Sequence, residues 1–396
     1  ERFYRRGVWD SALVYYQQAI THDSTFAVAL RRMALVLGWN APTTSEYRPL
    51  EEYVGRYVRL NHGLSPRDSL LVAADSYWTA AEGGAAPAAD LVRIRYRSLS
   101  TLEEAARRYP GDPEVWLALG ETRQHSPPPL GEQPAAALEA FNRVISLDPG
   151  FAPAYEHTVQ LAMRLNQPEL ARKYAETYLR LGPSDWFAPS IRLAAAMLDP
   201  ARSHAPETDR MMDSTPNLEL FRAGFEHLGP AADSEEAAIR ILRVLDQRSG
   251  NGSDVWSDTL MYHQYLAALL AYRGHLREAY AVDRRLLLDP SVSPYSAFGD
   301  PFRHLALLGA IPDSLAAAHF GQSLRSSKPW SQYGRSLEAL PWWLARRDTA
   351  SLKQFAFRAG QEARRQREGV AQLRARYLHA AATAYLALLR ADSVQA

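Results

Sequence analysis

Apolar residues recur along most of this chain at the three- and four-residue spacing of an amphipathic helix. Between residues 46 and 60 they fall at Leu50, Tyr53, Val54, Tyr57 and Val58, which lie on one face if the segment is helical. Prolines and glycines separate such segments, at the places where helices begin and end. No segment alternates apolar and polar residues for long enough to predict a sheet. The pattern therefore predicts an all-α protein.

The predicted helices repeat with a fixed period. The stretch 137–183 predicts a helix, a turn at 148–150, a second helix, a break at 166–168 and a third helix ending at 182–183. Pro149 and Pro183 are 34 residues apart, as are Ala137 and Ala171. Residues 19–30 (AITHDSTFAVAL) also align with residues 144–155 (VISLDPGFAPAY), with Asp, Phe and Ala in register. A 34-residue period closed by a proline is typical of a helix-turn-helix repeat.

Small and large residues fall where such a repeat needs them. We call the helix that follows the proline turn the first helix of a repeat, and its partner the second helix. Ala137 and Ala171 lie near the start of second helices, where a bulky side chain would cost about 1–3 kcal/mol in overpacking. Tyr155 and Trp116 occupy the large position of first helices, and Gly120 the small one.

These features resemble the tetratricopeptide repeat (TPR) family. The resemblance implies an all-α fold, an α-solenoid of TPR-like antiparallel helix pairs forming a right-handed superhelix. It divides the chain into a TPR array over residues 1–200 and more divergent TPR-like helical repeats over 201–396, beyond a polar connection at 199–216. Within the second part, Ala279 is expected at a small position. The chain opens inside a repeat, which predicts that it is a piece of a longer polypeptide.

Three segments of the first part carry a narrower resemblance. They are LSPRDSLLVAADSY (64–77), YRSL to ALGE (96–121) and FNRVISLDPGFAPAYEH (141–157). Together they resemble the TPR region that follows the catalytic domain in bacterial serine/threonine protein kinases and related signalling regulators. The resemblance implies a sensor or scaffold module of a signalling protein, either in the extracytoplasmic part of a membrane-anchored protein or in the cytoplasm. No kinase motif lies in this chain.

Composition narrows the possible partners. The net charge of +1 lacks the basic excess of nucleic-acid binders, so no nucleic-acid partner is expected. Cysteine is absent, which excludes disulfides and thiolate metal sites. The longest apolar run, 265–272, is far shorter than the roughly 20 residues of a membrane span. A protein or peptide is the expected partner.

No motif predicts catalysis, a cofactor or a metal, so we expect a protein that is not an enzyme. Asn251 to Asp254 with Asp258 is rich in oxygen ligands but lacks the pattern of a calcium loop. His263 and His275 fit an ordinary helix face and turn better than a metal site. The arginines near the C-terminus alternate with acids, which favours a solvated surface over a phosphate site. This set comprises Arg358, Arg364, Arg365, Arg367, Arg374 and Arg376.

Binding residues are predicted from the repeat geometry, because first helices line the concave face of such arrays. Counting from the large position gives six inward-pointing polar candidates, for which a solvated face is the alternative: Arg31, Glu121, Gln124, Glu156, Gln160 and Arg164. The alternative function is a glycan- or small-ligand-binding helical receptor that uses Trp330, Trp342 and Trp343. Their helical spacing favours packing between helices instead.

Overall fold

The computed structural model describes most of the chain, namely residues 1–40, 48–82, 88–126, 134–184, 187–229, 231, 234–249, 259–288, 301–325, 333–366 and 370–390. Over these residues it contains helices and no strand, so the predicted all-α class is confirmed. The chain forms two compact units, which we call unit 1 (Glu1–Ala238) and unit 2 (Ile239–Ala396). Each is described by itself.

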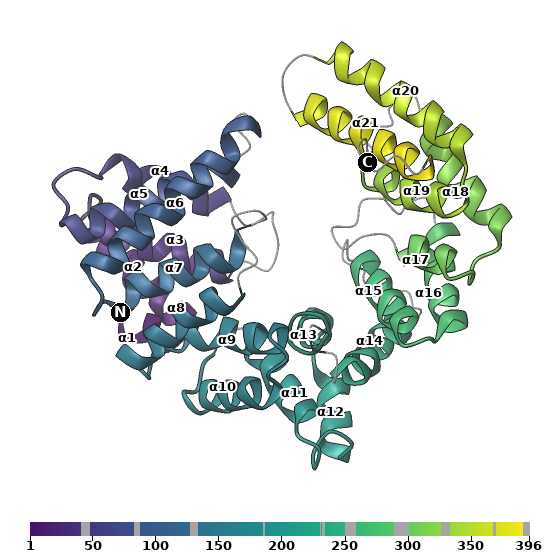
Figure 1. The fold of residues 1–396 in the computed structure, drawn as a ribbon. Coiled ribbons are helices and arrows are strands. Elements are labelled where there is room, and N and C mark those ends of the chain that lie inside the picture. Colours follow the sequence, from purple (N-terminus) through teal and green to yellow (C-terminus); the bar gives the residue numbers. More distant parts are fainter. Residues whose placement is uncertain are drawn as a thin grey trace. The chain divides into compact units, whose positions relative to one another are not determined.

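Consecutive helices of unit 1 pack as pairs (Figure 1). The pairs are α3 with α4, α5 with α6, α7 with α8 and α9 with α10, as a solenoid of TPR-like helix pairs requires. The helices are α1 (Arg2–Arg5), α2 (Trp9–His22), α3 (Ala27–Asn40), α4 (Arg48–Arg59), α5 (Pro66–Glu82), α6 (Ala88–Arg108), α7 (Pro113–His125), α8 (Pro134–Leu147), α9 (Pro153–Arg164), α10 (Pro168–Arg180), α11 (Phe187–Leu198), α12 (Pro206–Ser214), α13 (Asn217–Arg222) and the π-helix η2 (Ala223–Leu228).

Unit 2 continues the pairing, with α15 against α16 and α20 against α21. Its helices are α14 (Glu235–Ser249), which begins at the end of unit 1, α15 (Thr259–Tyr272), α16 (Leu276–Leu288), α17 (Pro301–Leu307), α18 (Asp313–Arg325), α19 (Tyr333–Ala345), α20 (Thr349–Arg365) and α21 (Val370–Leu389). Trp342 packs against Phe320 and Trp343 against Phe355, and both indoles are buried. The packing interpretation is confirmed for these two tryptophans, while Trp330 lies outside the described residues.

Both units use the same turn between the first and second helices of a pair. Five such turns within the described residues each contain one residue with a positive φ, between 51° and 82°: Gly7, Asn166, Gly274, Gly309 and Arg347. The next residue donates its N–H to the carbonyl five residues earlier, as from Gln167 to Ala162 and from His275 to Leu270. This is the Schellman arrangement that ends a helix. Its recurrence is structural evidence for the repeat, independent of the proline period.

The small positions predicted from the sequence are confirmed. Ala137, Ala171 and Ala279 are all buried near the start of second helices. At Gly120 an added Cβ would lie 2.9 Å from a ring carbon of Phe141, so α7 and α8 approach too closely there for any side chain. Tyr155 fills its large position and donates its hydroxyl to the Pro149 carbonyl at 3.0 Å.

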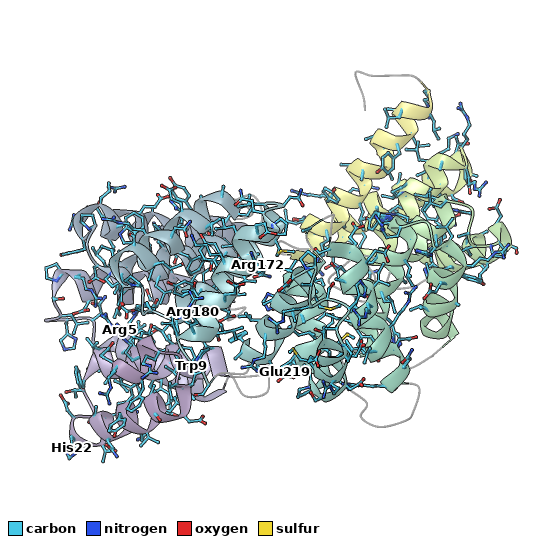
Figure 2. All side chains as sticks on the ribbon, turned by 90° about the horizontal axis from the view of Figure 1, so that it is seen from below. Arg5, Trp9, His22, Arg172, Arg180 and Glu219 are labelled. Carbon is cyan, nitrogen blue, oxygen red and sulfur yellow. The ribbon has the colours of Figure 1, made fainter. Side chains whose placement is uncertain are left out.

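The N-terminal helix α1 contacts residues that are far from it in the sequence, as well as the neighbouring helix α2. The Ala152 N–H donates to the Arg5 carbonyl at 2.7 Å, and the Arg5 guanidinium pairs with Asp148 at 2.6 Å. The Tyr4 ring also meets Phe151 edge-on. Helix α1 is therefore fixed against the turn between α8 and α9, and Figure 2 labels Arg5 and the buried Trp9 at this end of unit 1. The contact brings the first repeat beside α7.

The two compact units divide at residue 238, while the predicted division at 200 into regular and more divergent repeats stays a prediction. The polar connection at 199–216 contains α12, and Leu220 and Phe221 of α13 are buried. Because α11 packs against α12, α13 and η2, these elements join unit 1. Within the described residues, no helix is both long and apolar enough to cross a membrane.

Candidate functional site

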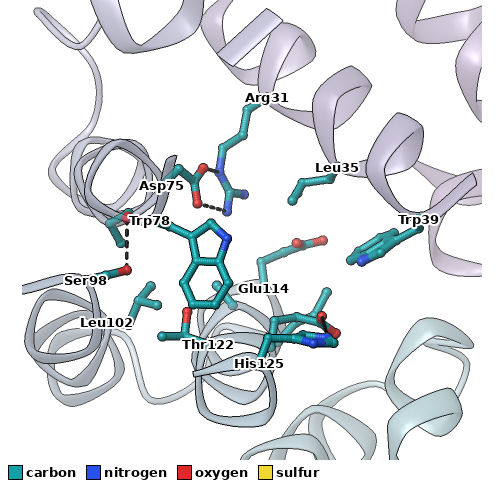
Figure 3. A pocket seen from close by; sticks show the side chains of 14 residues that line it. Arg31, Leu35, Trp39, Asp75, Trp78, Ser98, Leu102, Glu114, Thr122 and His125 are labelled. Atoms are coloured by element: carbon teal, nitrogen blue, oxygen red, sulfur yellow. Dashed lines mark hydrogen bonds and ion pairs between the residues drawn. The ribbon is translucent and has the colours of Figure 1, made fainter. Parts of the chain in front are cut away.

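A cavity of about 180 Å³ lies among the first helices of unit 1 (Figure 3). Helices α3, α5 and α7 supply most of its wall, and the second helix α6 supplies the rest. The lining residues are Arg31, Leu35, Trp39, Ala74, Asp75, Trp78, Ser98, Leu102, Glu114, Leu117, Ala118, Glu121, Thr122 and His125. The wall thus combines two indoles and a hydrocarbon surface with one guanidinium, three carboxyl groups and an imidazole.

One side of the cavity carries a buried ion pair. Arg31 is 5% exposed, and its Nε lies 2.6 Å from Asp75 Oδ2. The Tyr57 hydroxyl donates to the same carboxylate oxygen at 3.1 Å. Burial would lower the pKa of Arg31, but the Asp75 carboxylate outweighs burial and raises it. The guanidinium therefore stays charged, and Asp75 neutralises it.

Glu114 presents a second buried carboxylate. It is 3% exposed; Arg32 Nη1 lies 2.7 Å from its Oε2, and the Tyr4 hydroxyl donates to that same oxygen at 3.3 Å. The other oxygen, Oε1, is buried and has no hydrogen-bond partner among the described residues. A buried carboxylate oxygen left unpaired costs free energy. Since Glu114 lines the cavity (Figure 3), a turn of its side chain would bring this buried oxygen to a donor on a ligand there.

The cap at the start of α7 positions the Glu114 carboxylate. Asp112 is the N-cap of α7 and accepts from the N–H groups of Glu114 and Val115, while Pro113 takes the first helical position. The Asp112 side chain is held in turn by Arg67 of α5, at 2.8 Å. The first turn of α7 is thereby tied to α5, and Glu114 is directed inward against α1 and α3.

A second cluster lies where α7 meets α9. His125 Nε2 and His157 Nε2 are 3.3 Å apart, and they lie 3.5 Å and 3.4 Å from Glu121 Oε2. Glu121 and His125 are four residues apart on α7, so they share a face. Burial would raise the pKa of Glu121, but His157 and His125 outweigh burial and lower it. Burial would lower the pKa of His157, yet Glu121 raises it to about 9.

The six residues predicted from the repeat geometry divide into three groups. Arg31 and Glu121 line the cavity. Gln124 and Gln160 contact each other, with the Gln124 amide donating at 2.9 Å. Glu156 is half-buried beside His157, whose pKa it helps to raise, and Arg164 is exposed at the end of α9. The structure thus gathers five of the six around α7 and its neighbours and leaves Arg164 at the edge, but their role in binding stays a prediction.

Several cavity residues were not singled out from the sequence. No signal in the sequence indicated Asp75, Glu114, Trp39 and Trp78, because their convergence depends on how three helices, α3, α5 and α7, are offset. The Glu121–His125 spacing on a predicted first helix was a visible signal, since it places a carboxylate and an imidazole on one face. The position of His157 beside them depends on the packing of α9 against α7.

The remaining candidates lie partly within and partly outside the described residues. His263 is buried against Asp246, with Nε2 and Oδ1 2.9 Å apart, and His275 is exposed in a turn. They belong to no metal-binding group among the described residues, in line with their interpretation as a helix-face and a turn residue. Arg358 donates to the Leu324 carbonyl and Arg365 pairs with Glu362. Residues 251–254, Asp258 and Arg367 lie outside the described residues.

No protein-family model matches this sequence, and no curated protein matches it. Among solved structures the chain is similar to the human IFIT1 dimer with PPP-AAAA, at 14% identity and a TM-score of 0.34, over 98% of this chain and 92% of that chain. A TM-score so low carries no argument about ligand or activity. The TPR-like description therefore rests on the helix pairs, their turns and their small positions, and the narrower resemblance to kinase-associated regions stays a prediction.

Proposed function

We propose that unit 1 binds an extended segment of a partner protein across its first helices and holds one basic side chain of that segment in the cavity. The observation that carries this proposal is the unpaired Oε1 of Glu114. A lysine ammonium or an arginine guanidinium would donate to this oxygen, and a hydrogen bond between charged groups is stronger than a neutral one. The partner segment would thus be recognised by one positively charged side chain that enters the cavity.

The size of the cavity supports a single side chain. Sites for drug-sized molecules and cofactors usually measure about 300–1,000 Å³, whereas this cavity measures about 180 Å³. A lysine or arginine side chain, with about five to seven heavy atoms, suits this volume, and the peptide backbone would remain outside. The rest of the segment would then contact the exposed parts of the first helices.

The indoles of the wall also favour a cation. The carboxylates of the lining, those of Asp75, Glu114 and Glu121, are already paired with Arg31, Arg32 and His157. Trp39 and Trp78 add aromatic surface, and a cation over an indole face gains about 0.5–2 kcal/mol. An anionic side chain would lie beside the Glu114 carboxylate, whose Oε1 has no hydrogen-bond donor among the described residues, so acidic segments are expected to be rejected.

The proposal includes the biological setting implied by the sequence. We infer a non-catalytic sensor or scaffold module of a bacterial signalling protein, attached to a serine/threonine kinase, and the support for this setting is the resemblance of three segments of residues 64–157 alone. The alternative, a receptor that uses the C-terminal tryptophans, loses support because Trp342 and Trp343 are buried between helices.

A peptide array tests the proposal. Peptides of equal length and neutral background carry a central lysine, arginine, methionine or glutamate, and the full chain is titrated against each. The wild type is expected to prefer lysine and arginine, and Glu114→Gln and Trp78→Leu to lose this preference. Glu169→Gln, an exposed carboxylate on α10, is the matched control and should keep it.

Two outcomes would overturn the proposal. One is equal binding of the four peptides by the wild type, and the other is a preference that survives in both variants. Because Glu114→Gln also removes the charge that pairs with Arg32, its fold is checked by circular dichroism and thermal unfolding. Trp78→Leu leaves the ion pair between Arg32 and Glu114 intact. If Glu114→Gln is destabilised, the result for Trp78→Leu therefore decides the test.

A further inference from the structure

The three side chains of the second cluster converge on a single point. Glu121 Oε2, His125 Nε2 and His157 Nε2 are separated from one another by 3.3, 3.4 and 3.5 Å. Among the described residues, this is the group of histidine and acidic side chains that can hold a metal ion. We propose that Glu121, His125 and His157 form a binding site for a divalent transition metal, with zinc the ion that fits best.

The separations favour tetrahedral coordination. Zinc binds imidazole nitrogens and carboxylate oxygens at about 2.0–2.2 Å, so ligand atoms at the tetrahedral angle lie about 3.3–3.6 Å apart. Octahedral ligands at a similar bond length would lie closer, at about 3.0 Å. The observed separations fall in the tetrahedral range, and a small shift of the side chains would complete the coordination.

The ligand types select against the common alkaline-earth ions. Calcium and magnesium prefer sites made wholly of oxygen ligands, whereas two imidazoles and one carboxylate suit zinc and its first-row neighbours. Three protein ligands leave one tetrahedral position open. The open position can take a water molecule or a ligand group, and Glu121 and His125 also line the cavity.

Neighbouring contacts hold the cluster in place. The His157 ring packs against Phe141, with the ring centroids 5.5 Å apart. The Gln124–Gln160 hydrogen bond joins α7 to α9 beside the cluster. The His125 side chain is half exposed, which gives an ion a path from solvent. The two helices are thus fixed relative to each other before any metal arrives.

Zinc titration of the full chain tests the site. Protein freed of metal with a chelator is titrated with ZnCl₂ by calorimetry, and the wild type is expected to bind one zinc ion per chain. His125→Ala and His157→Ala should each weaken zinc binding by roughly a hundredfold or more, since even residues that only orient a ligand cost about 10–100-fold. His22→Ala, which removes an exposed histidine of α2, is the matched control and should leave the affinity unchanged.

A second readout separates this site from adventitious binding. Cobalt in place of zinc should give the strong visible absorption of tetrahedral coordination, and His125→Ala should abolish it. His125 is half exposed at the end of α7, so its loss is expected to leave the fold intact even if His157→Ala is destabilised. Absence of zinc binding by the wild type, or unchanged zinc binding by both histidine variants, would overturn the inference.

The inference is independent of the proposed function. The titration needs no partner peptide, and the peptide array is run with a chelator present. Failure of zinc binding would therefore leave the partner proposal standing, and loss of the lysine preference would leave the metal site standing. If both hold, adding zinc to the array shows whether the open coordination position takes part in recognition.

Discussion

The two units share a turn and a pairing rule and both bury aromatic rings, but the described part of unit 1 also buries arginines and a glutamate. In unit 1 the first helices bury Arg31, Arg32 and Glu114 around a cavity. In unit 2 the described part of α19 buries Trp342 and Trp343 against other aromatic rings. Buried polar groups in unit 2 are also present, as in the pair of His263 and Asp246. Helix pairs of this kind can thus pack around buried charged groups as well as around buried aromatic rings.

The difference has an energetic meaning. Removing charges from water costs several kcal/mol per ion, and a buried ion pair often stabilises less than apolar residues of the same volume. A buried indole, in contrast, stabilises the fold through its apolar area and its contacts. We therefore interpret the buried charged groups of unit 1 as functional and the buried indoles of unit 2 as structural. Substitutions in each unit and a change of pH test that distinction.

Trp343→Ala should destabilise unit 2 by about 3–5 kcal/mol, because it empties a site that is 1% exposed in the wild type. The change is measured as a shift of the corresponding transition in urea unfolding. Phe357→Ala, which removes an aromatic ring that is 62% exposed on α20, is the control and should change stability by less than about 0.5 kcal/mol. Zinc and peptide binding by unit 1 should be unchanged, and weakened binding would contradict the separation of roles.

Acid should destabilise unit 1 through His227. This side chain of η2 is 2% exposed and lies 3.3 Å from the Ser190 hydroxyl. Burial lowers the pKa of His227 to about 3, aided by the positive charges of Arg222 and His157. In the unfolded chain the His227 imidazole takes up a proton near pH 6.5. The contribution of His227 to the free energy of unfolding is therefore fully present above this pH, and it decreases as the pH drops towards 3.

The loss from His227 should reach about 2 kcal/mol between pH 6.5 and about pH 5. It is measured by urea unfolding at several pH values with a chelator present. His227→Gln should be less stable than the wild type at neutral pH but should vary less over this pH range. His22→Gln, at an exposed position of α2, should follow the wild type. Identical pH profiles for the wild type and His227→Gln would show that this histidine titrates normally.

Gly120→Ala should destabilise unit 1 by about 1 kcal/mol. The new methyl group would lie 2.9 Å from the fully buried Phe141 ring, and overpacking of this kind costs about 1–3 kcal/mol. Part of this cost is offset because alanine favours a helix over glycine by about 1 kcal/mol. Gly55→Ala is the control, since a Cβ there meets ordinary contact at 3.4 Å, and it should not destabilise. Equal effects of the two changes would show that α7 can move away from α8.

Periodic features were predictable from the sequence because each depends on one helix pair. The burial of Ala137, Ala171 and Ala279 follows from the 34-residue spacing, and the tight approach at Gly120 follows from the same register. The all-α class follows from the spacing of apolar residues, which a helix requires wherever it buries one face. These predictions needed no knowledge of how distant helices meet.

The cavity was not predictable in this way because it depends on contacts across several repeats. Glu114 lies inward because Tyr4 and Arg32, far away in sequence, pack against it. The packing of α1 on the turn between α8 and α9 determines that arrangement, and nothing in a 34-residue period indicates it. Likewise, Glu121 was predicted as a binding residue for its place on a first helix, but its two histidine neighbours follow from the offset between α7 and α9.

The smallest expected effect on stability concerns two polar side chains of α9. Replacing Glu156 and Arg164 together with glutamine should change the free energy of unfolding by less than about 0.5 kcal/mol. The variant should bind the lysine peptide roughly fivefold more weakly, because partly exposed charges contribute about 0.2–1 kcal/mol each. The matched control replaces Glu169 and Arg180, an acid and a base exposed on the second helix α10, and should bind like the wild type. Equal binding by both double variants would confine recognition to the cavity, since a segment lying along the first helices must cross α9 after leaving α7.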